Sequence, residues 1–225
     1  MKTTRIDRIC HAIKKKNCIV VDIGSDHAFL AIKLLKNKIA KFIYNVEINK
    51  KPLNQTIKNL TNHGLINKTK NILNDGLKNW KCDEQIDYAC ISGIGGNKIV
   101  YLIKNFPKNI KIANLIVIPN NNSDAVRKFL LKFKYRFIYE EIIKENGYYY
   151  PLIYVALNKK NKIKNNIQNQ YFGPYNLLHP SNNFINMLKE RKNYLNKNSL
   201  TKYNKNLNKE YKLIDQYLKK YNLHK

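Results

Sequence analysis

The sequence predicts an α/β fold in which a doubly wound, mostly parallel sheet ends in an antiparallel hairpin and precedes a helical tail. Three observations support this prediction. Short runs of β-branched residues alternate with stretches of helical period up to Lys134. Two extended runs then flank Asn146-Gly147, which is a strong hairpin signal. From Pro180 onward, apolar residues recur at helical spacing.

The parallel part alternates strands and helices in order. Expected strands lie at residues 18–22, 42–46, 71–73, 86–91 and 115–118. Expected helices lie at residues 5–16, 28–36, 51–63, 97–105 and 125–134. Pro52 in a first turn and Gly64 just past a last turn fit the helix over residues 51–63. The antiparallel strands cover residues 136–144 and 148–157, which closes a first domain at residues 1–157.

The composition changes after Leu157. Residues 158–180 begin with a stretch rich in Lys and Asn, which predicts a linker. Ser181 can cap a helix whose apolar face includes Phe184, Leu188 and Leu195, and a second such face follows Ser199. Residues 181–225 are therefore expected to form a hairpin of two helices.

Composition limits the class of protein. The chain has 225 residues, and its 44% hydrophobic content is enough for a buried core. No apolar run approaches the ~20 residues of a membrane-spanning helix, and the N-terminus lacks a signal-peptide pattern. The four Cys form no C-x-x-C pair, so we expect a reduced cytoplasmic protein with no metal site.

The formal net charge is +27, from 42 Lys and Arg against 15 Asp and Glu. Such an excess is typical of proteins that bind a polyanion. Most of the basic residues are Lys, however, and Lys, Asn, Ile and Tyr share AT-rich codons. The charge alone therefore fits either a nucleic-acid partner or a biased genome composition.

The turn after the first strand carries the most informative pattern. It reads Asp22-Ile23-Gly24-Ser25-Asp26-His27 and lacks the glycines of a dinucleotide-binding loop. Its carboxylates would repel a phosphate but suit a cationic ligand rich in hydroxyl groups, and S-adenosylmethionine has these properties. Glu47 ends the second strand, where a carboxylate can bind ribose hydroxyls, and Asp75 follows the third, where it can accept from an adenine amine. Together these strand ends predict a ligand site at the carboxyl edge of the sheet.

These residues identify a family by resemblance. Asp22-Ile23-Gly24-Ser25-Asp26-His27-Ala28-Phe29-Leu30 closely resembles the signature of the TrmK family of bacterial tRNA methyltransferases. Similar segments follow in the family's order: 46–48, 74–77, 92–96, 118–120 and the hairpin at 140–154. The resemblance spans about residues 5–157, and the tail is similar to the family's helical C-terminal domain. This chain departs from the family's pattern at Val46, Ser92, Ile94 and Ile118, and a Gln is usual in place of Ile118.

The resemblance implies a Rossmann-like class I methyltransferase that moves a methyl group from S-adenosylmethionine to N1 of adenine 22 in tRNA. Asp26 and Asn120 are the implied catalytic residues. The implied cofactor-binding residues are Asp22, Gly24, Ser25, His27, Glu47, Asp75, Gly76, Gly93 and Ile94. The implied RNA contacts are Arg5, Arg8, Pro119, Lys192 and Lys202, and residues 181–225 become the expected tRNA-binding domain. We also expect a monomer that uses no metal and no membrane.

Adenine N1 has a lone pair and can attack a sulfonium methyl directly, so the enzyme mainly positions its substrates. A carboxylate such as Asp26 can stabilise the resulting charge or accept a proton, or it can simply cap the next helix. His27 either shapes the cofactor pocket or only packs, and Asn120 either bonds the target base or only holds its turn. The basic face of the first helix either borders the substrate or is merely solvated.

Two other functions remain open at this point. The enzyme can use the same cofactor on another RNA site, a small molecule or a protein. Alternatively, the chain is a non-catalytic RNA-binding module on a decayed methyltransferase fold, although the intact acidic and glycine positions argue against decay.

Overall fold

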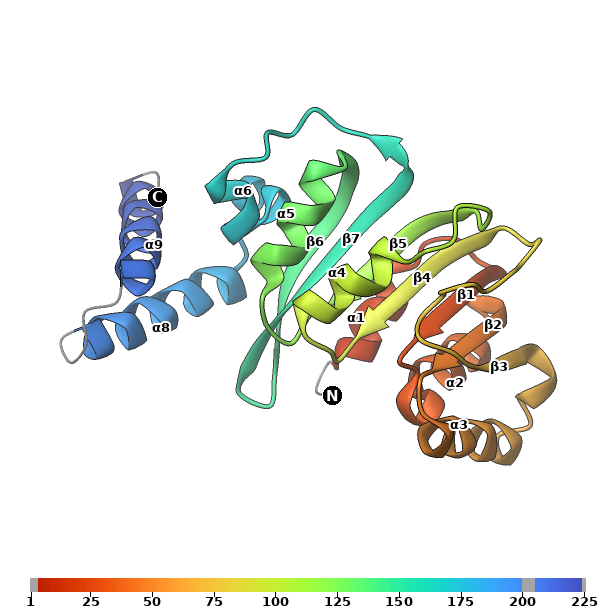
Figure 1. Ribbon diagram of the computed structural model, residues 1–225. Coiled ribbons are helices and arrows are strands. Elements are labelled where there is room, and N and C mark those ends of the chain that lie inside the picture. The colour runs from red at the N-terminus through yellow and green to blue at the C-terminus, as the bar shows by residue number, and fades with distance from the viewer. Residues whose placement is uncertain (1–3, 200–204, 224–225) are drawn as a thin grey trace.

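The structure is a computed structural model that describes residues 4–199 and 205–223 (Figure 1). Its centre is a seven-stranded sheet in the order β3-β2-β1-β4-β5-β7-β6. The first five strands are parallel, whereas β7 pairs antiparallel with β5 and β6 pairs antiparallel with β7. The strands are β1 (Cys18–Ile23), β2 (Ala40–Glu47), β3 (Thr69–Leu73), β4 (Ile86–Ser92), β5 (Ile112–Ile118), β6 (Tyr135–Glu145) and β7 (Tyr148–Lys160).

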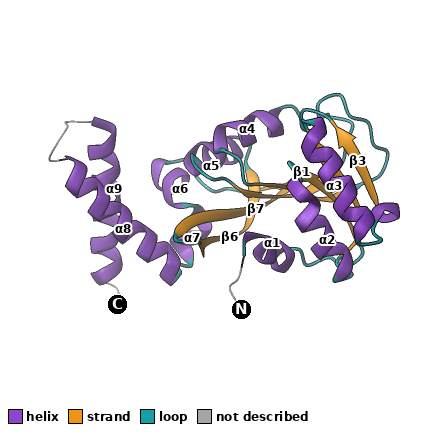
Figure 2. Ribbon diagram, turned by 90° about the horizontal axis from the view of Figure 1, so that it is seen from below, coloured by secondary structure: helices purple, strands orange, loops and turns teal. Residues whose placement is uncertain are grey.

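Helices cover both faces of the sheet. In the first domain they are α1 (Arg5–Ala12), the 3-10 turn η1 (Asp26–Ala28), α2 (Phe29–Lys36), α3 (Lys50–Asn62), the 3-10 turn η2 (Ile66–Lys68), α4 (Gly96–Lys104) and α5 (Ser123–Lys132). Figure 2 shows α4 and α5 on one face and α1 and α2 on the other. Each face has its own core: Ile9, Leu34 and Leu60 lie in one, and Ile99 and Leu130 lie in the other. The predicted Rossmann-like sheet ending in an antiparallel hairpin is confirmed.

The first helix ends earlier than its apolar spacing indicates. A capping box fixes its start, with Thr4 bonding the backbone of Asp7 and Asp7 bonding the backbone of Thr4. It ends at Ala12 because Ile13 adopts an extended conformation, with φ −76° and ψ 108°. Residues 14–17 therefore lead into β1 rather than continuing the basic face of the helix.

Residues 158–180, expected to be a linker, contain ordered structure. The last strand runs on to Lys160, and α6 (Ile167–Phe172) and α7 (Pro174–Leu178) follow. Phe172 is buried in a third core, and the ring of Tyr175 lies 5.1 Å from that of Tyr139 on β6. The low apolar content of residues 158–170 conceals this packing, because a few aromatic side chains after Gln170 provide it.

The tail consists of α8 (Asn182–Ser199) and α9 (Lys205–Leu223), which pack together at the β6 end of the molecule (Figure 1). Ser181 accepts a hydrogen bond from the backbone of Phe184, as a cap should. The third core joins these helices to the sheet domain through Ile142 on β6 and Phe172 on α6. Among the described residues, no helix has the length and apolar character needed to cross a membrane.

Candidate functional site

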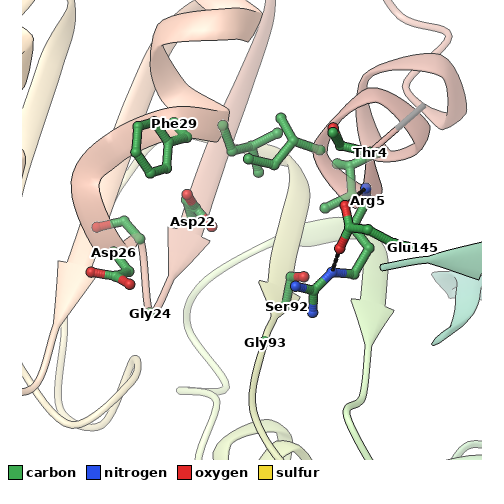
Figure 3. Close-up of a pocket in the computed structure, with 13 residues that line it drawn as sticks. Thr4, Arg5, Asp22, Gly24, Asp26, Phe29, Ser92, Gly93 and Glu145 are labelled. Carbon is green, nitrogen blue, oxygen red and sulfur yellow. Dashed lines mark hydrogen bonds and ion pairs between the residues drawn. The ribbon is translucent and has the colours of Figure 1, made fainter. Parts of the chain in front are cut away.

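A cleft of about 300 Å³ opens at the carboxyl ends of β1 and β4. One wall comes from β1 and the segment after it, and the other comes from the start of α1 and the end of β6 (Figure 3). Ser92 and Gly93, at the end of β4, lie between the two walls. The remaining lining residues are Thr4, Arg5, Ile6, Ile9, Asp22, Gly24, Ser25, Asp26, Phe29, Leu30 and Glu145.

Two glycines leave the backbone of the cleft uncovered. Gly24 has φ +79° and Gly93 has φ +83°, in the region that favours glycine. A Cβ added at either position would meet no atom within 4 Å. The turn at Gly24 is fixed because its N–H donates to the carbonyl of Val46 at 2.9 Å. A ligand can therefore approach the backbone closely at the ends of both β1 and β4.

Two carboxylates are buried beside this turn. Asp22 is 5% exposed, and no described group donates a hydrogen bond to its carboxylate. Burial, followed by the nearby charge of Glu47, raises the pKa of Asp22 to about 7. Glu47 is also buried, and burial raises its pKa, while the backbone N–H of Asp26 opposes that rise. The Asp22 carboxylate, which accepts no hydrogen bond from the described residues, and the nearby Glu47 carboxylate suit a ligand that brings positive charge and hydroxyl donors.

Asp26 lies on the rim of the cleft in a turn of unusual geometry. His27 and Ala28 have φ +60° and φ +59°, although neither is glycine. Nδ2 of Asn59, on α3, donates to the carbonyl of His27 at 2.9 Å and holds this turn. The Asp26 side chain remains 75% exposed, and its Oδ1 lies 3.3 Å from Nε2 of His27. The carboxylate is thus free to meet a substrate at the mouth of the cleft.

The loops after β4 and β5 are tied together by Asn120. Its backbone N–H donates to the carbonyl of Ile94 at 2.9 Å, and its Nδ2 donates to the carbonyl of Gly93 at 2.6 Å. Its Oδ1 accepts from Nη1 of Arg5 at 3.2 Å. Each end of this amide keeps one further hydrogen-bonding position. Ile118, where the family usually has Gln, is fully buried in the core below this loop.

The remaining predicted cofactor residues lie outside the cleft lining. Asp75 accepts hydrogen bonds from Tyr101 at 2.8 Å and Lys98 at 3.1 Å, and these contacts lower its pKa. Gly76, at φ +60°, lies against Leu102, whose Cδ2 would be 2.5 Å from an added Cβ. Ile94 packs on the core of the α4 and α5 face. His27 lies in the turn after β1, Glu47 ends β2 and Asp75 follows β3, and none of the three lines the cleft.

The predicted RNA contacts are mostly engaged in ion pairs. Nε of Arg5 lies 2.5 Å from Oε2 of Glu145, and Nε of Arg8 lies 2.7 Å from Oε1 of Glu141. Nζ of Lys192 lies 2.6 Å from Oδ1 of Asp215 on α9. Lys202 lies outside the described residues. Pro119 and Asn120 face a second cavity of about 410 Å³, which α8 and α9 also line.

Several cleft residues carry no signal in the sequence. Thr4, Ile6 and Glu145 line the cleft only because α1 docks against the end of β6. Phe29 lies inside the signature segment, but the sequence indicates only that it belongs to a helix over residues 28–36. Among the described residues, no group of three or more His, Cys, Asp and Glu side chains is arranged to hold a metal ion.

Comparison with known proteins gives a consistent set of relatives. A family model described as TrmK, tRNA (adenine(22)-N(1))-methyltransferase, matches residues 20–222. The "Putative tRNA methyltransferase MG248" of Mycoplasma genitalium is 27% identical over 161 residues, covering 69% of this chain and 70% of the relative. The tRNA (adenine(22)-N(1))-methyltransferase of Bacillus subtilis is 30% identical over 136 residues, which are 60% of this chain and 57% of the relative.

A solved structure extends the similarity to nearly the whole chain. M. capricolum TrmK in complex with S-adenosyl-homocysteine is 29% identical, with a TM-score of 0.86. The alignment covers 97% of this chain and 98% of that one. The likeness therefore includes the helices after the sheet as well as the sheet itself.

Proposed function

This chain belongs to the TrmK family of tRNA (adenine(22)-N(1))-methyltransferases, and we infer that it transfers the methyl group of S-adenosylmethionine to N1 of adenine 22 in tRNA. One observation of the structure carries this function. The open glycine turn at Gly24 lies between two buried carboxylates, Asp22 and Glu47, at the carboxyl edge of the sheet. That edge is where open α/β sheets bind ligands.

The residues present fit the cofactor. S-adenosylmethionine carries an ammonium and a sulfonium but no phosphate, and the carboxylate of Asp22 has no hydrogen-bonding partner among the described residues. Glu47 would accept the ribose hydroxyls, and Ser25, whose Oγ lies 3.4 Å from Glu47, would support that carboxylate. Gly24 and Gly93 would admit the ligand to the backbone. His27, Asp75, Gly76 and Ile94 would shape the surroundings, with Asp75 accepting from the adenine amine.

The chemistry requires no covalent enzyme intermediate. S-adenosylmethionine supplies a methyl group on a positively charged sulfur, and the lone pair of adenine N1 forms the new N–C bond as the C–S bond breaks. The protein's task is to align the two partners. Cys10, Cys18 and Cys90 are buried, and burial raises the pKa of each thiol, so none is suited to act as a nucleophile.

Asp26 is the residue we assign to the charge that develops on the base. Methylation at N1 makes the adenine cationic or requires loss of a proton from N6. The exposed carboxylate at the cleft rim can stabilise that cation or accept that proton. Asn120, which is fixed by three hydrogen bonds, would hold the base edge with the remaining positions of its amide.

The tRNA would be bound by the basic surface of the whole chain. We assign residues 1–157 to methyl transfer, residues 158–180 to the connection, and residues 181–225 to tRNA binding. Arg5, Arg8, Pro119, Lys192 and Lys202 are the proposed contacts, and the net charge of +27 supports a polyanionic partner. We further propose that the enzyme acts on tRNA as a monomer and in the cytoplasm.

A methylation assay on the full chain tests this function. Unmodified tRNA with adenine at position 22 should gain one N1-methyladenine there when labelled S-adenosylmethionine is supplied, as mass spectrometry would show. The same tRNA with guanine at position 22 should stay unlabelled, whereas persistent labelling would point to another acceptor. Asp26→Ala should lower kcat by about 10²–10⁴-fold and leave cofactor affinity unchanged. Tight tRNA binding without cofactor binding in calorimetry would instead favour a non-catalytic RNA-binding module.

A further inference from the structure

Phe29 is the largest apolar side chain exposed in the cleft. It is 56% exposed, although it begins α2, whose residues Leu30, Ala31 and Leu34 are buried in the core. Burying an aromatic ring is strongly favourable, so an exposed ring in a ligand cleft calls for a partner. In Figure 3, Phe29 and Asp26 lie on one side of the cleft, and Arg5 and Glu145 lie on the other.

The backbone before Phe29 is strained in a way that fixes this arrangement. His27 and Ala28 adopt left-handed conformations that favour glycine, which is unfavourable for both residues. Ala28 is fully buried, and Asn59 anchors the carbonyl of His27, so the turn is held from both ends. The His27 ring lies nearly parallel to that of Phe29, with 5.5 Å between the ring centroids and an interplanar angle of 21°. The strained turn thus places the Phe29 ring and the Asp26 carboxylate at the same rim.

We propose that Phe29 is the stacking platform for the adenine that is methylated. This assignment rests on the proposed function and adds the residue that receives the base. A base within folded tRNA must leave its stack to reach a buried methyl donor, and a new stacking surface offsets part of the lost stacking energy. A ring beside the Asp26 carboxylate would hold the face of the adenine while that carboxylate meets its edge.

The position of Phe29 favours the substrate base over the cofactor. Glu47, the proposed ribose ligand, ends β2, and β1 separates β2 from β4. Phe29 lines the same cleft as Asp22, Ser92 of β4 and Thr4, the N-cap residue of α1, whereas Glu47 does not line it. The ring therefore lies across the cleft from Arg5 of α1, on a side from which Glu47 is absent, and borders the space that the second reactant would enter.

The test replaces Phe29 with residues that separate stacking from apolar contact. Phe29→Leu keeps an apolar side chain but loses the aromatic face, and Phe29→Tyr keeps that face. Phe133→Leu is the matched control, because Phe133 is 44% exposed at the end of α5 and lies outside the cleft lining. Each full-length variant is assayed for kcat/KM with tRNA, for S-adenosylmethionine affinity by calorimetry, and for binding of tRNA with 2-aminopurine at position 22.

Phe29→Leu should lower kcat/KM for tRNA by about 5- to 150-fold, the range expected for one base–aromatic stack, without changing cofactor affinity. Bound 2-aminopurine should fluoresce with a longer lifetime in Phe29→Leu than in wild type, because the flipped base would no longer be quenched by stacking. Phe29→Tyr, which keeps the aromatic face, should lose much less kcat/KM than Phe29→Leu and keep the short lifetime, and Phe133→Leu should behave like wild type.

An unchanged lifetime and rate in Phe29→Leu would overturn the stacking role, and so would an equal loss of cofactor affinity, which would make Phe29 a cofactor wall. These outcomes are distinct from failure of the function itself. A wild-type protein that binds S-adenosylmethionine but leaves adenine 22 unmethylated would refute the proposed function together with this assignment.

Discussion

Nη1 of Arg5 lies 3.2 Å from Oδ1 of Asn120, so the first helix and the loop after β5 meet across 115 residues of sequence. The same guanidinium pairs with Glu145 and lies over the ring of Tyr150, with its Cζ 4.2 Å from the ring centroid. Arg5 thereby connects α1, the β6–β7 hairpin and the loop that carries Asn120. Arg5 and the neighbouring Arg8–Glu141 ion pair hold the side of the cleft that faces Phe29.

Replacing Arg5 with Met should show that this connection matters for the substrate. We expect the free energy of unfolding to fall by about 1–3 kcal/mol, because a half-buried charged hydrogen bond is lost and Glu145 keeps, among the described residues, only the backbone N–H of residue 5 as a donor. The Arg5→Met substitution should lower kcat/KM for tRNA more when residue 120 is Asn than when it is Ala. A double-mutant cycle of Arg5→Met and Asn120→Ala measures this coupling, expected at about 0.5–3 kcal/mol. Additive effects would show that the two residues act separately.

Asp22 should make the stability of the ligand-free protein depend on pH. Its pKa is raised from 3.8 to about 7, so the folded state binds a proton more tightly than the unfolded chain between about pH 4 and 7. The stabilisation is therefore fully present below pH 4 and is lost as pH rises through 7. Between pH 5 and pH 8 the free energy of unfolding should fall by about 2–3 kcal/mol through this effect.

Chemical denaturation of wild type and Asp22→Asn at several pH values provides the measurement. The free energy of unfolding of the variant should fall by about 2–3 kcal/mol less than that of wild type between pH 5 and pH 8. Calorimetry should also show that the variant binds S-adenosylmethionine more weakly than wild type. Parallel stability curves for the two proteins would mean that Asp22 does not carry the effect.

Gly24→Ala should weaken cofactor binding far more than it weakens folding. Gly64 offers a matched control, because it also has positive φ, +65° against +79°, and open space where a Cβ would be added. Both substitutions impose similar backbone strain, on the order of 1–2 kcal/mol. Only Gly24 lines the cleft, so calorimetry should show a loss of S-adenosylmethionine affinity in Gly24→Ala alone. Equal affinities would exclude close ligand approach at Gly24.

Gly173→Ala should destabilise the junction between the sheet domain and the tail. An added Cβ would lie 2.5 Å from Oε2 of Glu140 and 2.8 Å from Nε of Arg127, which form an ion pair with side chains 0% and 2% exposed. Disturbing a buried pair of this kind typically lowers the free energy of unfolding by about 3–5 kcal/mol. Gly147→Ala, at φ +84° in open space, should show only the backbone strain. The difference between the two denaturation midpoints measures the steric effect, and similar midpoints would contradict it.

The sequence alone determined much of the sheet and the cofactor side of the site. Strands and helices have different side-chain periods, and those periods depend on local backbone geometry, so they are readable without tertiary contacts. Asp22, Gly24 and Glu47 could be assigned to one edge because parallel strands all end on the same side of a sheet. The resemblance to the family added the proposed roles of Asp26 and Asn120.

The tertiary structure alone decided the substrate side. Glu145 reaches the cleft through a contact with Arg5 across 140 residues, and the periodicity of neither segment indicates where α1 docks. Because α1 docks there, Arg5 and Arg8 form ion pairs that the sequence does not indicate. The exposure of Phe29 follows from a strained turn at His27 and Ala28, whose conformation neither residue type favours. Local chain preferences determine the helices and strands, whereas packing between distant segments determines which side chains line the cleft.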